Sequence, residues 1–264
     1  MNENKAGLGY QDFEEVRTQH IFYIDKTDFI REWWEYADKV TLITRPRRFG
    51  KTLNMSMTEQ FFSLKYAGQG GIFEGLSIWE TEAYRNPQGT YPVISLTFAN
   101  VKETCYRNAR KKIFMIISEL YSEFSFLLDS DILSENDRAF FRRISINMDD
   151  VDAAMAIHYL SEFLFLYYGK KVIILLDEYD TPMQEAYVNG YWDELVSFMR
   201  TFFNSTFKTN PFLERALLTG ITRVRKESIF SGLNNLEVVT TTSEKYETAF
   251  GFTEKEVFTA LEEQ

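Results

Sequence analysis

The chain carries the sequence Thr44-Arg45-Pro46-Arg47-Arg48-Phe49-Gly50-Lys51-Thr52 between an apolar run, Val40–Thr44, and a helical pattern that starts at Lys51. A strand followed by such a loop and a helix is typical of a phosphate-binding site, because successive backbone N–H groups and the positive end of the helix converge on one point. Gly50 lets the backbone approach an anion where a Cβ would collide. We expect Lys51 to reach the β and γ phosphates of a nucleotide and the hydroxyl of Thr52 to bind Mg²⁺.

The loop departs from the general phosphate-loop pattern at one position. Arg45 stands five residues before Gly50, where the pattern has a glycine. Pro46 fixes its own φ and favours an extended Arg45, so the turn can begin without that glycine. The alternative explanation is an ordinary basic helix start. It is disfavoured because four basic residues between positions 45 and 51 would oppose the helix dipole unless an anion is bound there.

A second polar motif follows the most apolar run of the chain. Val172–Leu176 has the composition of a buried strand, and Asp177 and Glu178 come directly after it. We expect Asp177 to hold Mg²⁺ and Glu178 to act as the general base for an attacking water. Taken alone, the motif is equally typical of a solvated strand end, but the phosphate loop upstream favours the catalytic interpretation. Asp180 is better explained as a turn or helix cap before Pro182 than as a catalytic residue.

Apolar runs and helical patterns alternate along the chain. The other strand-like runs are Val93–Phe98, Arg215–Thr219 and Leu236–Thr240, and the helical patterns cover Lys51–Lys65, Glu103–Leu127, Ser134–Ile144, Asp150–Tyr168 and Tyr191–Phe207. This alternation predicts an α/β fold with a doubly wound, mainly parallel sheet. The strand near Val93 lies between the two motifs in sequence, which favours the P-loop NTPase type that has an additional strand between the loop strand and the acid strand and a catalytic glutamate. The helical patterns between the second and third strands also predict a helical insertion.

Composition limits the class of protein. Of the 264 residues, 45% are apolar, and the net charge of −10 argues against a protein whose main task is to coat nucleic acid or an anionic membrane. Apolar runs such as Val172–Leu176 are far shorter than the ~20 residues that a membrane-spanning helix needs. The N-terminus lacks the pattern of a targeting signal. We therefore expect a cytoplasmic protein with no membrane partner.

Three further features have simple structural explanations. The single cysteine, Cys105, excludes an internal disulfide framework and a cysteine-rich zinc module. His20 and His158 are far apart in the sequence and lack ligand-like neighbours, which argues against a histidine-based metal site. The basic run Arg107–Lys112 is more typical of a solvated helix face than of a DNA contact, and both interpretations stay open.

Several motifs together resemble those of the bacterial AAA-ATPase-like family. They are Tyr23–Thr27, Arg45–Thr52, Leu175–Asp180, Ser228–Leu236 and Gly251–Glu254. The resemblance covers nearly the whole chain, and it implies an ATPase domain over 1–264 in which the segment 1–39 flanks the nucleotide site and 253–264 starts a helical lid. Members of this family usually continue into that lid and commonly into a nuclease-like domain of the restriction-endonuclease type. Neither follows here, so the resemblance implies an isolated ATPase module or a truncated chain.

The resemblance also implies roles for residues near the end of the fourth strand. By analogy with related ATPases, a polar residue there senses the γ phosphate; Thr219 fits best, with Thr222 as the second choice. Arg223 and Arg225 are candidates for contacting the transferred phosphate in the same subunit or for reaching a neighbouring subunit as an arginine finger. Solvated loop charges are the equal alternative for both arginines.

Before the first strand, where such folds often hold the base, Tyr23 or Phe22 is a candidate for stacking on adenine, and core packing is the alternative. The predicted nucleotide-binding residues are Arg45, Pro46, Arg47, Arg48, Phe49, Gly50, Lys51, Thr52, Leu53, Tyr23 and Thr219. The predicted metal ligands are Thr52 and Asp177, and the predicted catalytic residues are Glu178, Lys51 and Arg223.

The leading functional hypothesis is Mg²⁺-dependent hydrolysis of ATP that drives a conformational switch. One alternative is a nucleotide-gated binding module that holds ATP with little or no hydrolysis and recruits DNA or another protein. Phosphoryl transfer to a small acceptor fits the loop but not the adjacent pair Asp177 and Glu178. For partners, the sequence predicts a nucleotide and leaves open a homo-oligomer and a DNA or protein partner that binds through a missing C-terminal domain.

Overall fold

A computed structural model describes residues 7–222, 229, 230 and 232–262. Five strands, all parallel, form one sheet in the order β2-β3-β4-β1-β5. The strands are β1 (Val40–Thr44), β2 (Val93–Thr97), β3 (Val172–Asp177), β4 (Leu213–Gly220) and β5 (Leu236–Val239). Every strand lies where an apolar run predicted one, and the predicted α/β class with a parallel sheet is confirmed.

The order of the strands decides which loops meet. β4 lies between β1 and β3, with Thr44 opposite Gly220 on one side and Leu176 opposite Leu218 on the other. This confirms the predicted additional strand between the loop strand and the acid strand, but that strand is β4, and β2, near Val93, lies at the edge of the sheet beside β3. Because all strands run the same way, the loop after β1, the acid motif after β3 and the end of β4 lie at the same carboxyl edge of the sheet.

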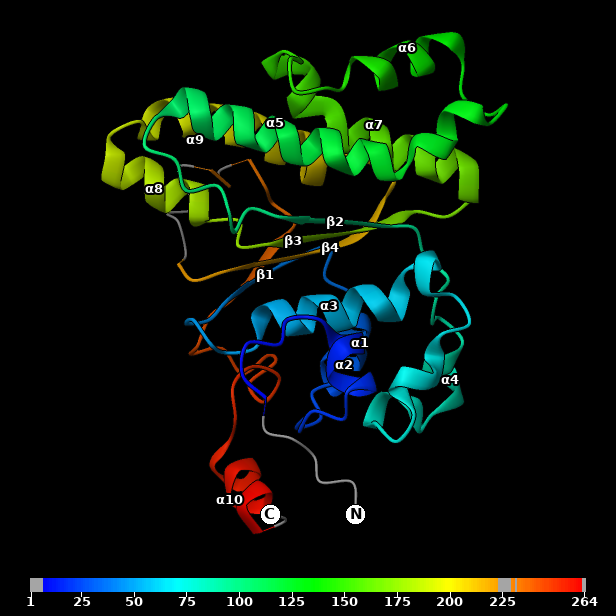
Figure 1. Cartoon of the computed structure of the whole chain (residues 1–264), viewed down its shortest axis with the longest axis vertical. Helices are drawn as coiled ribbons and strands as arrows, with labels where there is room; N and C mark the ends of the chain where they lie inside the picture. The colour runs from blue at the N-terminus through cyan, green and yellow to red at the C-terminus, as the bar shows by residue number, and fades with distance from the viewer. Residues whose placement is uncertain (1–6, 223–228, 231, 263–264) are drawn as a thin grey trace.

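Helices cover both faces of the sheet (Figure 1). One layer contains α5 (Tyr106–Glu123), α6 (Glu135–Arg143), α7 (Asp150–Tyr168), α8 (Thr181–Asn189) and α9 (Trp192–Phe203). The other contains α1 (Phe13–Thr18), α2 (Asp28–Tyr36), α3 (Lys51–Phe62) and α4 (Glu82–Arg85). α10 (Glu254–Glu262) lies beyond the second layer.

Five short turns of helix complete the described elements. They are η1 (Leu64–Tyr66), η2 (Gly70–Phe73), η3 (Ser77–Trp79), η4 (Ser125–Asp129) and the π-helix η5 (Asn204–Lys208).

The two faces of the sheet support two hydrophobic cores. Along β3, Ile174 and Leu176 pack with the layer of α5, α7 and α9, whereas Ile173 and Leu175 pack with α2 and α3. Successive side chains of a strand point to opposite faces, so a strand buried on both sides must be apolar throughout. This explains why Val172–Leu176 of β3 is a continuous apolar run.

Helix boundaries differ from the sequence patterns where the backbone changes direction. α3 ends at Phe62 instead of Lys65, because Ser63 is extended and bridges to Tyr91. The pattern that ran to Phe207 is α9 followed by the π-helix η5. The predicted helical insertion is not confirmed: α6 contributes Phe140 and Phe141 to the same core as α5 and α7. In the part of the chain that the structure describes, no helix has the length and apolar content to cross a bilayer.

Candidate functional site

The loop between β1 and α3 has an unusual backbone conformation. Arg48 and Gly50 have positive φ angles of 69° and 75°, and this alternation of backbone handedness curls the loop into a concave nest of N–H groups. The N–H of Arg45 is bonded to Gly220 O at 3.1 Å, which ties the start of the loop to β4. Among the described residues, nothing accepts a hydrogen bond from the N–H groups of 47–53. The nest and the helix N-terminus are thus ready to bind an anion.

Lys51 lies at the centre of this loop. Its ammonium donates to Arg45 O at 3.0 Å and to Pro46 O at 2.9 Å, and the side chain is only 7% exposed. Burial lowers the pKa of Lys51, and the carboxylates of Asp177 and Glu178 oppose that shift. The ammonium therefore lies within the electrostatic influence of the acid motif.

Asp177 brings three elements together. Its Oδ2 accepts a hydrogen bond of 2.7 Å from the hydroxyl of Thr52 on α3, and its Oδ1 accepts one from the hydroxyl of Thr219 on β4. A buried carboxylate beside a threonine hydroxyl supplies hard oxygen atoms, the donor type that Mg²⁺ prefers, and leaves other positions for water and phosphate. The predicted ligands Thr52 and Asp177 are in contact, and Thr219 reaches the same carboxylate.

Asp180 lies in the turn before α8, and its side chain bonds to a distant part of the chain. It precedes α8, but its side chain makes no cap hydrogen bond to that helix. The fully buried carboxylate instead accepts hydrogen bonds from the N–H of Thr222 at 2.8 Å, the hydroxyl of Thr222 at 2.7 Å and the amide of Gln184 at 2.8 Å. The expectation of a turn or helix cap before Pro182 is confirmed, because Asp180 lies in a turn at the N-cap position of α8, although its side chain bonds to Thr222 and Gln184 instead of the first N–H groups of the helix. The hydroxyl of Thr222, the second choice for a phosphate sensor, donates its hydrogen bond to Asp180.

The predicted contacts of the loop divide into two groups. Pro46, Arg47, Arg48, Phe49 and Gly50 are exposed, and Leu53 is half-buried. Arg45 is buried: its guanidinium donates to Thr44 O at 3.1 Å and lies over the ring of Phe250, 5.5 Å from the centroid. The side chain of Arg45 thus packs within the fold, and its carbonyl oxygen accepts a hydrogen bond from Lys51. Arg223 and Arg225 lie outside the described residues.

A cavity of about 220 Å³ adjoins the loop. Its walls come from the segment 7–10, from Phe22 and Tyr23, from Leu53 and from Phe252, with Arg48, Phe49 and Gly50 at the rim of the loop. The hydroxyl of Tyr23 donates to Met57 Sδ at 3.4 Å, and its ring packs edge-on against Phe13. Burial is the main cause that raises the pKa of Tyr23. The structure thus gives Tyr23 both a packing role and a surface on the cavity.

Sequence reasoning missed the support that the C-terminal segment gives to the loop. The N–H of Gly251 donates to Phe49 O at 3.2 Å, and the amide of Asn54 donates to Ala249 O at 2.8 Å. The ammonium of Lys26 pairs with Glu256 of α10 at 2.6 Å. The signals were present, because Lys26, Gly251 and Glu256 lie in or next to motifs already singled out for the resemblance.

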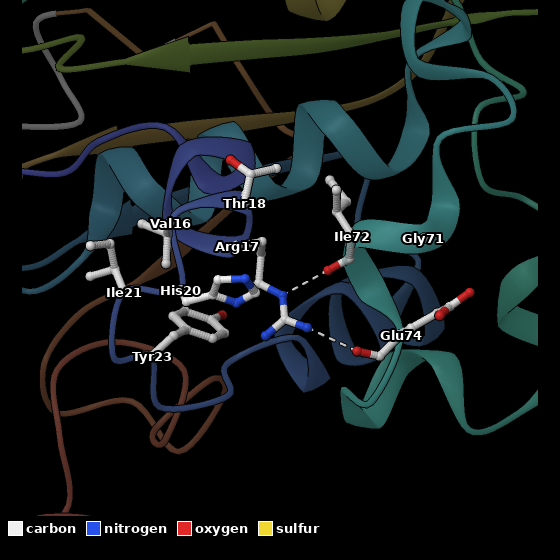
Figure 2. Close-up of a pocket in the computed structure, with 9 residues that line it drawn as sticks. All are labelled: Val16, Arg17, Thr18, His20, Ile21, Tyr23, Gly71, Ile72 and Glu74. Carbon is white, nitrogen blue, oxygen red and sulfur yellow. Dashed lines mark hydrogen bonds between the residues drawn. The ribbon is translucent and has the colours of Figure 1, made fainter. Parts of the chain in front are cut away.

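A second cavity, of about 390 Å³, lies between α1 and η2 and shares Tyr23 with the first (Figure 2). Arg17 spans it, donating from Nε to Ile72 O and from Nη2 to Glu74 O, both at 2.8 Å. His20 lies on its wall. These hydrogen bonds hold α1 against the segment of η2, and we give this cavity no functional role.

The remaining sequence candidates have structural partners or lie at the surface. Within the basic run, Arg110 pairs with Asp150, and Lys112 pairs with Glu103 at 3.2 Å. Cys105 is exposed. Among the described residues, no cluster of three or more histidine, cysteine, aspartate or glutamate side chains has the arrangement of a metal site.

The parallel sheet with this strand order and the loop at its carboxyl edge define a protein with the P-loop NTPase fold. The chain belongs to the AAA-ATPase-like family, described as "Predicted AAA-ATPase", whose pattern matches residues 7–230. It is also similar to an uncharacterized protein encoded in the vnfD 5′ region of Azotobacter chroococcum mcd 1, with 26% identity over 259 residues. That match covers 97% of this chain and 45% of the relative, so the chain spans less than half of the relative's length. No solved structure matches.

Proposed function

We propose that this chain binds ATP with Mg²⁺ and hydrolyses it to drive a conformational switch. The observation that carries the proposal is the row of N–H groups at 47–53, which have no acceptor in the part of the chain that the structure describes and lie at the N-terminus of α3, close to the ammonium of Lys51. Unpaired backbone donors are costly unless water or a ligand satisfies them, and three phosphate groups provide the acceptors. The membership in the AAA-ATPase-like family supports a nucleotide as that ligand.

In this proposal Lys51 exchanges its carbonyl partners for phosphate oxygens. Its bonds to Arg45 O and Pro46 O occupy two of its three donors, and the phosphates offer charged acceptors in their place. The same ammonium stabilises the charge that develops on the γ phosphate during transfer. Lys51 thus serves both binding and catalysis.

The hydroxyl of Thr52 and the carboxylate of Asp177 would hold Mg²⁺. When bound, the ion neutralises charge on the phosphate oxygens. Thr219 keeps Asp177 oriented through its hydrogen bond and lies at the strand end next to the nest, where it can respond to the γ phosphate. Glu178 accepts a proton from the water that attacks the γ phosphate, as a carboxylate general base does.

We assign the base of the nucleotide to the cavity of about 220 Å³ beside the loop. Leu53 and the rings of Tyr23 and Phe252 supply apolar and aromatic surface there, which suits the flat face of adenine. The cavity shares Arg48 and Gly50 with the phosphate nest, so one ligand can occupy both. Arg48, Phe49 and Leu53 are accordingly proposed contacts of the nucleoside end.

The wider assembly is also part of the proposal. Arg223 is proposed to act on the transferred phosphate from the same subunit or from a neighbour in a homo-oligomer. α10 is proposed as the start of a lid, and a DNA or protein partner would receive the conformational change in the cytoplasm. The relative, of which this chain covers 45%, has room for regions that contact such a partner.

The test is a comparison of ATP binding and turnover. Isothermal titration of the purified chain with ATP and Mg²⁺ should show saturable binding, and phosphate release should depend on Mg²⁺ and stop with EDTA. A flat titration would overturn the whole proposal. Saturable binding with no phosphate release would remove the hydrolytic step and favour the nucleotide-gated binding module.

A further inference from the structure

The backbone at Glu178 is held in an unusual conformation. Glu178 has φ = 51°, in the left-handed region that residues other than glycine seldom occupy. Such strain persists only where the surroundings enforce it, and it is frequent at functional sites. The N–H of Glu178 donates to Asp177 Oδ1 at 3.0 Å, so the turn begins at the carboxylate that contacts Thr52 and Thr219.

Thr181 contacts both ends of Glu178. Its hydroxyl donates to Glu178 Oε2 at 2.9 Å, and its N–H donates to Glu178 O at 3.2 Å. Thr181 is 6% exposed, whereas Glu178 is half-buried and so remains accessible to solvent on one side. The hydroxyl therefore fixes the direction of a carboxylate that would otherwise be free to turn.

Thr181 is itself well fixed. It is the first residue of α8, and a β-branched side chain has little freedom about χ1. The preceding Asp180 is anchored to Thr222, which follows β4, and Gln184, one turn into α8, donates to the same carboxylate. The hydroxyl of Thr181 thus has a set position relative to the end of β4, where Thr219 contacts Asp177.

We propose that Thr181 is a positioning residue for hydrolysis: its hydroxyl holds the carboxylate of Glu178 in the direction from which it accepts the proton of the attacking water. This inference rests on the proposed role of Glu178. Thr181 does not touch the nucleotide, so its loss should lower kcat and leave nucleotide affinity unchanged. A base held in the wrong direction loses rate because proton transfer requires hydrogen-bond geometry.

The matched pair Thr181→Val and Thr181→Ser separates the hydroxyl from the methyl group. Val keeps the shape and removes the hydroxyl, and Ser keeps the hydroxyl. We expect Thr181→Val to lower kcat by roughly tenfold, less than the 100-fold or more that a general base contributes, with Kd for ATP within about twofold of wild type. Thr181→Ser should restore kcat. Thr201→Val, which removes an exposed helical hydroxyl bonded to Ser197 O, is the control for a generic loss of such a group.

Four results would contradict the inference. If Thr181→Val has the kcat of wild type, the hydroxyl has no part in hydrolysis. The same conclusion follows if Thr181→Val and Thr181→Ser are slowed equally. A fall in ATP affinity and melting temperature in Thr181→Val without a fall in kcat would make the residue structural. The slow ATP hydrolysis of Glu178→Gln can be followed over hours with radiolabelled ATP. Adding Thr181→Val to Glu178→Gln should not lower this rate further, and a further tenfold fall in the rate would show that Thr181 acts independently of Glu178.

The failure of the underlying proposal has its own signature. If Glu178→Gln hydrolyses ATP at the wild-type rate, Glu178 is not the base and both ideas fall. If Glu178→Gln is inactive and Thr181→Val is fully active, the role of Glu178 stands and only the positioning inference is overturned.

Discussion

The two edges of the sheet use arginine and backbone polar groups in opposite ways. At the amino edge, Arg215 of β4 is buried, donates to the carbonyls of Trp33 and Trp34 at 2.8 and 3.0 Å, and lies 3.9 Å from the centroid of a Trp34 ring. At the carboxyl edge, the N–H groups of 47–53 have no acceptor among the described residues, and Arg47 and Arg48 are exposed. Arg215 therefore donates to carbonyls within the fold, whereas the backbone donors of 47–53, which have no acceptor in the described part of the chain, are open to a ligand.

The largest effect should come from Glu178 at the carboxyl edge. Glu178→Gln removes the proton acceptor but keeps the shape of the side chain, so we expect kcat to fall by roughly 100-fold or more while Kd for ATP stays within about twofold. Phosphate release and titration calorimetry measure the two quantities. Glu194→Gln on the exposed face of α9 is the matched control. Undiminished turnover in Glu178→Gln would remove the general base from the carboxyl edge.

Lys51 should give the next largest effect, on binding. Lys51→Ala deletes the ammonium that lies among the loop carbonyls, and we expect Kd for ATP to rise by roughly 100-fold, about 2.7 kcal/mol. Lys171→Ala, an exposed lysine near the amino edge, should leave Kd unchanged. If Lys51→Ala and Lys171→Ala have the same Kd for ATP, the nucleotide does not bind at the carboxyl edge through Lys51.

At the amino edge the effect should be on stability alone. Arg215→Met keeps much of the contact with Trp33 and Trp34 but leaves their carbonyls without a donor, so we expect the free energy of unfolding to fall by about 2 kcal/mol. Urea denaturation measures this change, and the Kd for ATP of the folded variant should equal that of wild type. A weaker ATP affinity in Arg215→Met would show that the two edges are coupled.

The smallest effect should come from the ion pair between Lys26 and Glu256. Burial alone would raise the pKa of Glu256, but hydrogen bonds from Lys26 and from the N–H of Thr253 lower it overall from 4.5. A carboxylate with a lowered folded-state pKa stabilises the fold above its unfolded pKa and loses that contribution as pH falls through the folded value. We expect Glu256→Gln to reduce stability by less than about 1 kcal/mol at pH 7, because the pair is partly exposed.

The same measurement gives the sign of the pH effect. The difference in melting temperature between wild type and Glu256→Gln should be present at pH 7, shrink as pH falls below about 4.5 and disappear once Glu256 is protonated. A difference that grows with acidity would contradict the lowered pKa.

The sequence predicted the middle of the sheet well because β1 and β3 are buried on both faces. Val172–Leu176 had to be apolar at every position, and such a run cannot be confused with a surface strand. The contact of Thr52 with Asp177 was predictable for a related reason, since a phosphate loop and an acidic strand end have few other ways to meet in a parallel sheet.

What the sequence did not predict depends on contacts between distant segments. The side chain of Arg45 belongs to a basic run, but the ring that it packs against is Phe250, about 200 residues away, and no local pattern reveals that contact. Asp180 has the position of a helix cap, and its partner Thr222 comes from the end of another strand. A long polar side chain can reach several partners, and the tertiary fold determines which of them it contacts.

The position of β4 has a consequence for the order in which the protein is made. β1 and β3 do not pair with each other, because β4 lies between them and comes later in the chain. A nascent chain that has left the ribosome only as far as Asp177 carries the loop and the acid motif but lacks the strand that joins them. ATP added to arrested nascent chains should therefore protect them from protease only when the arrest point lies far enough beyond Gly220 for that residue to have emerged from the exit tunnel.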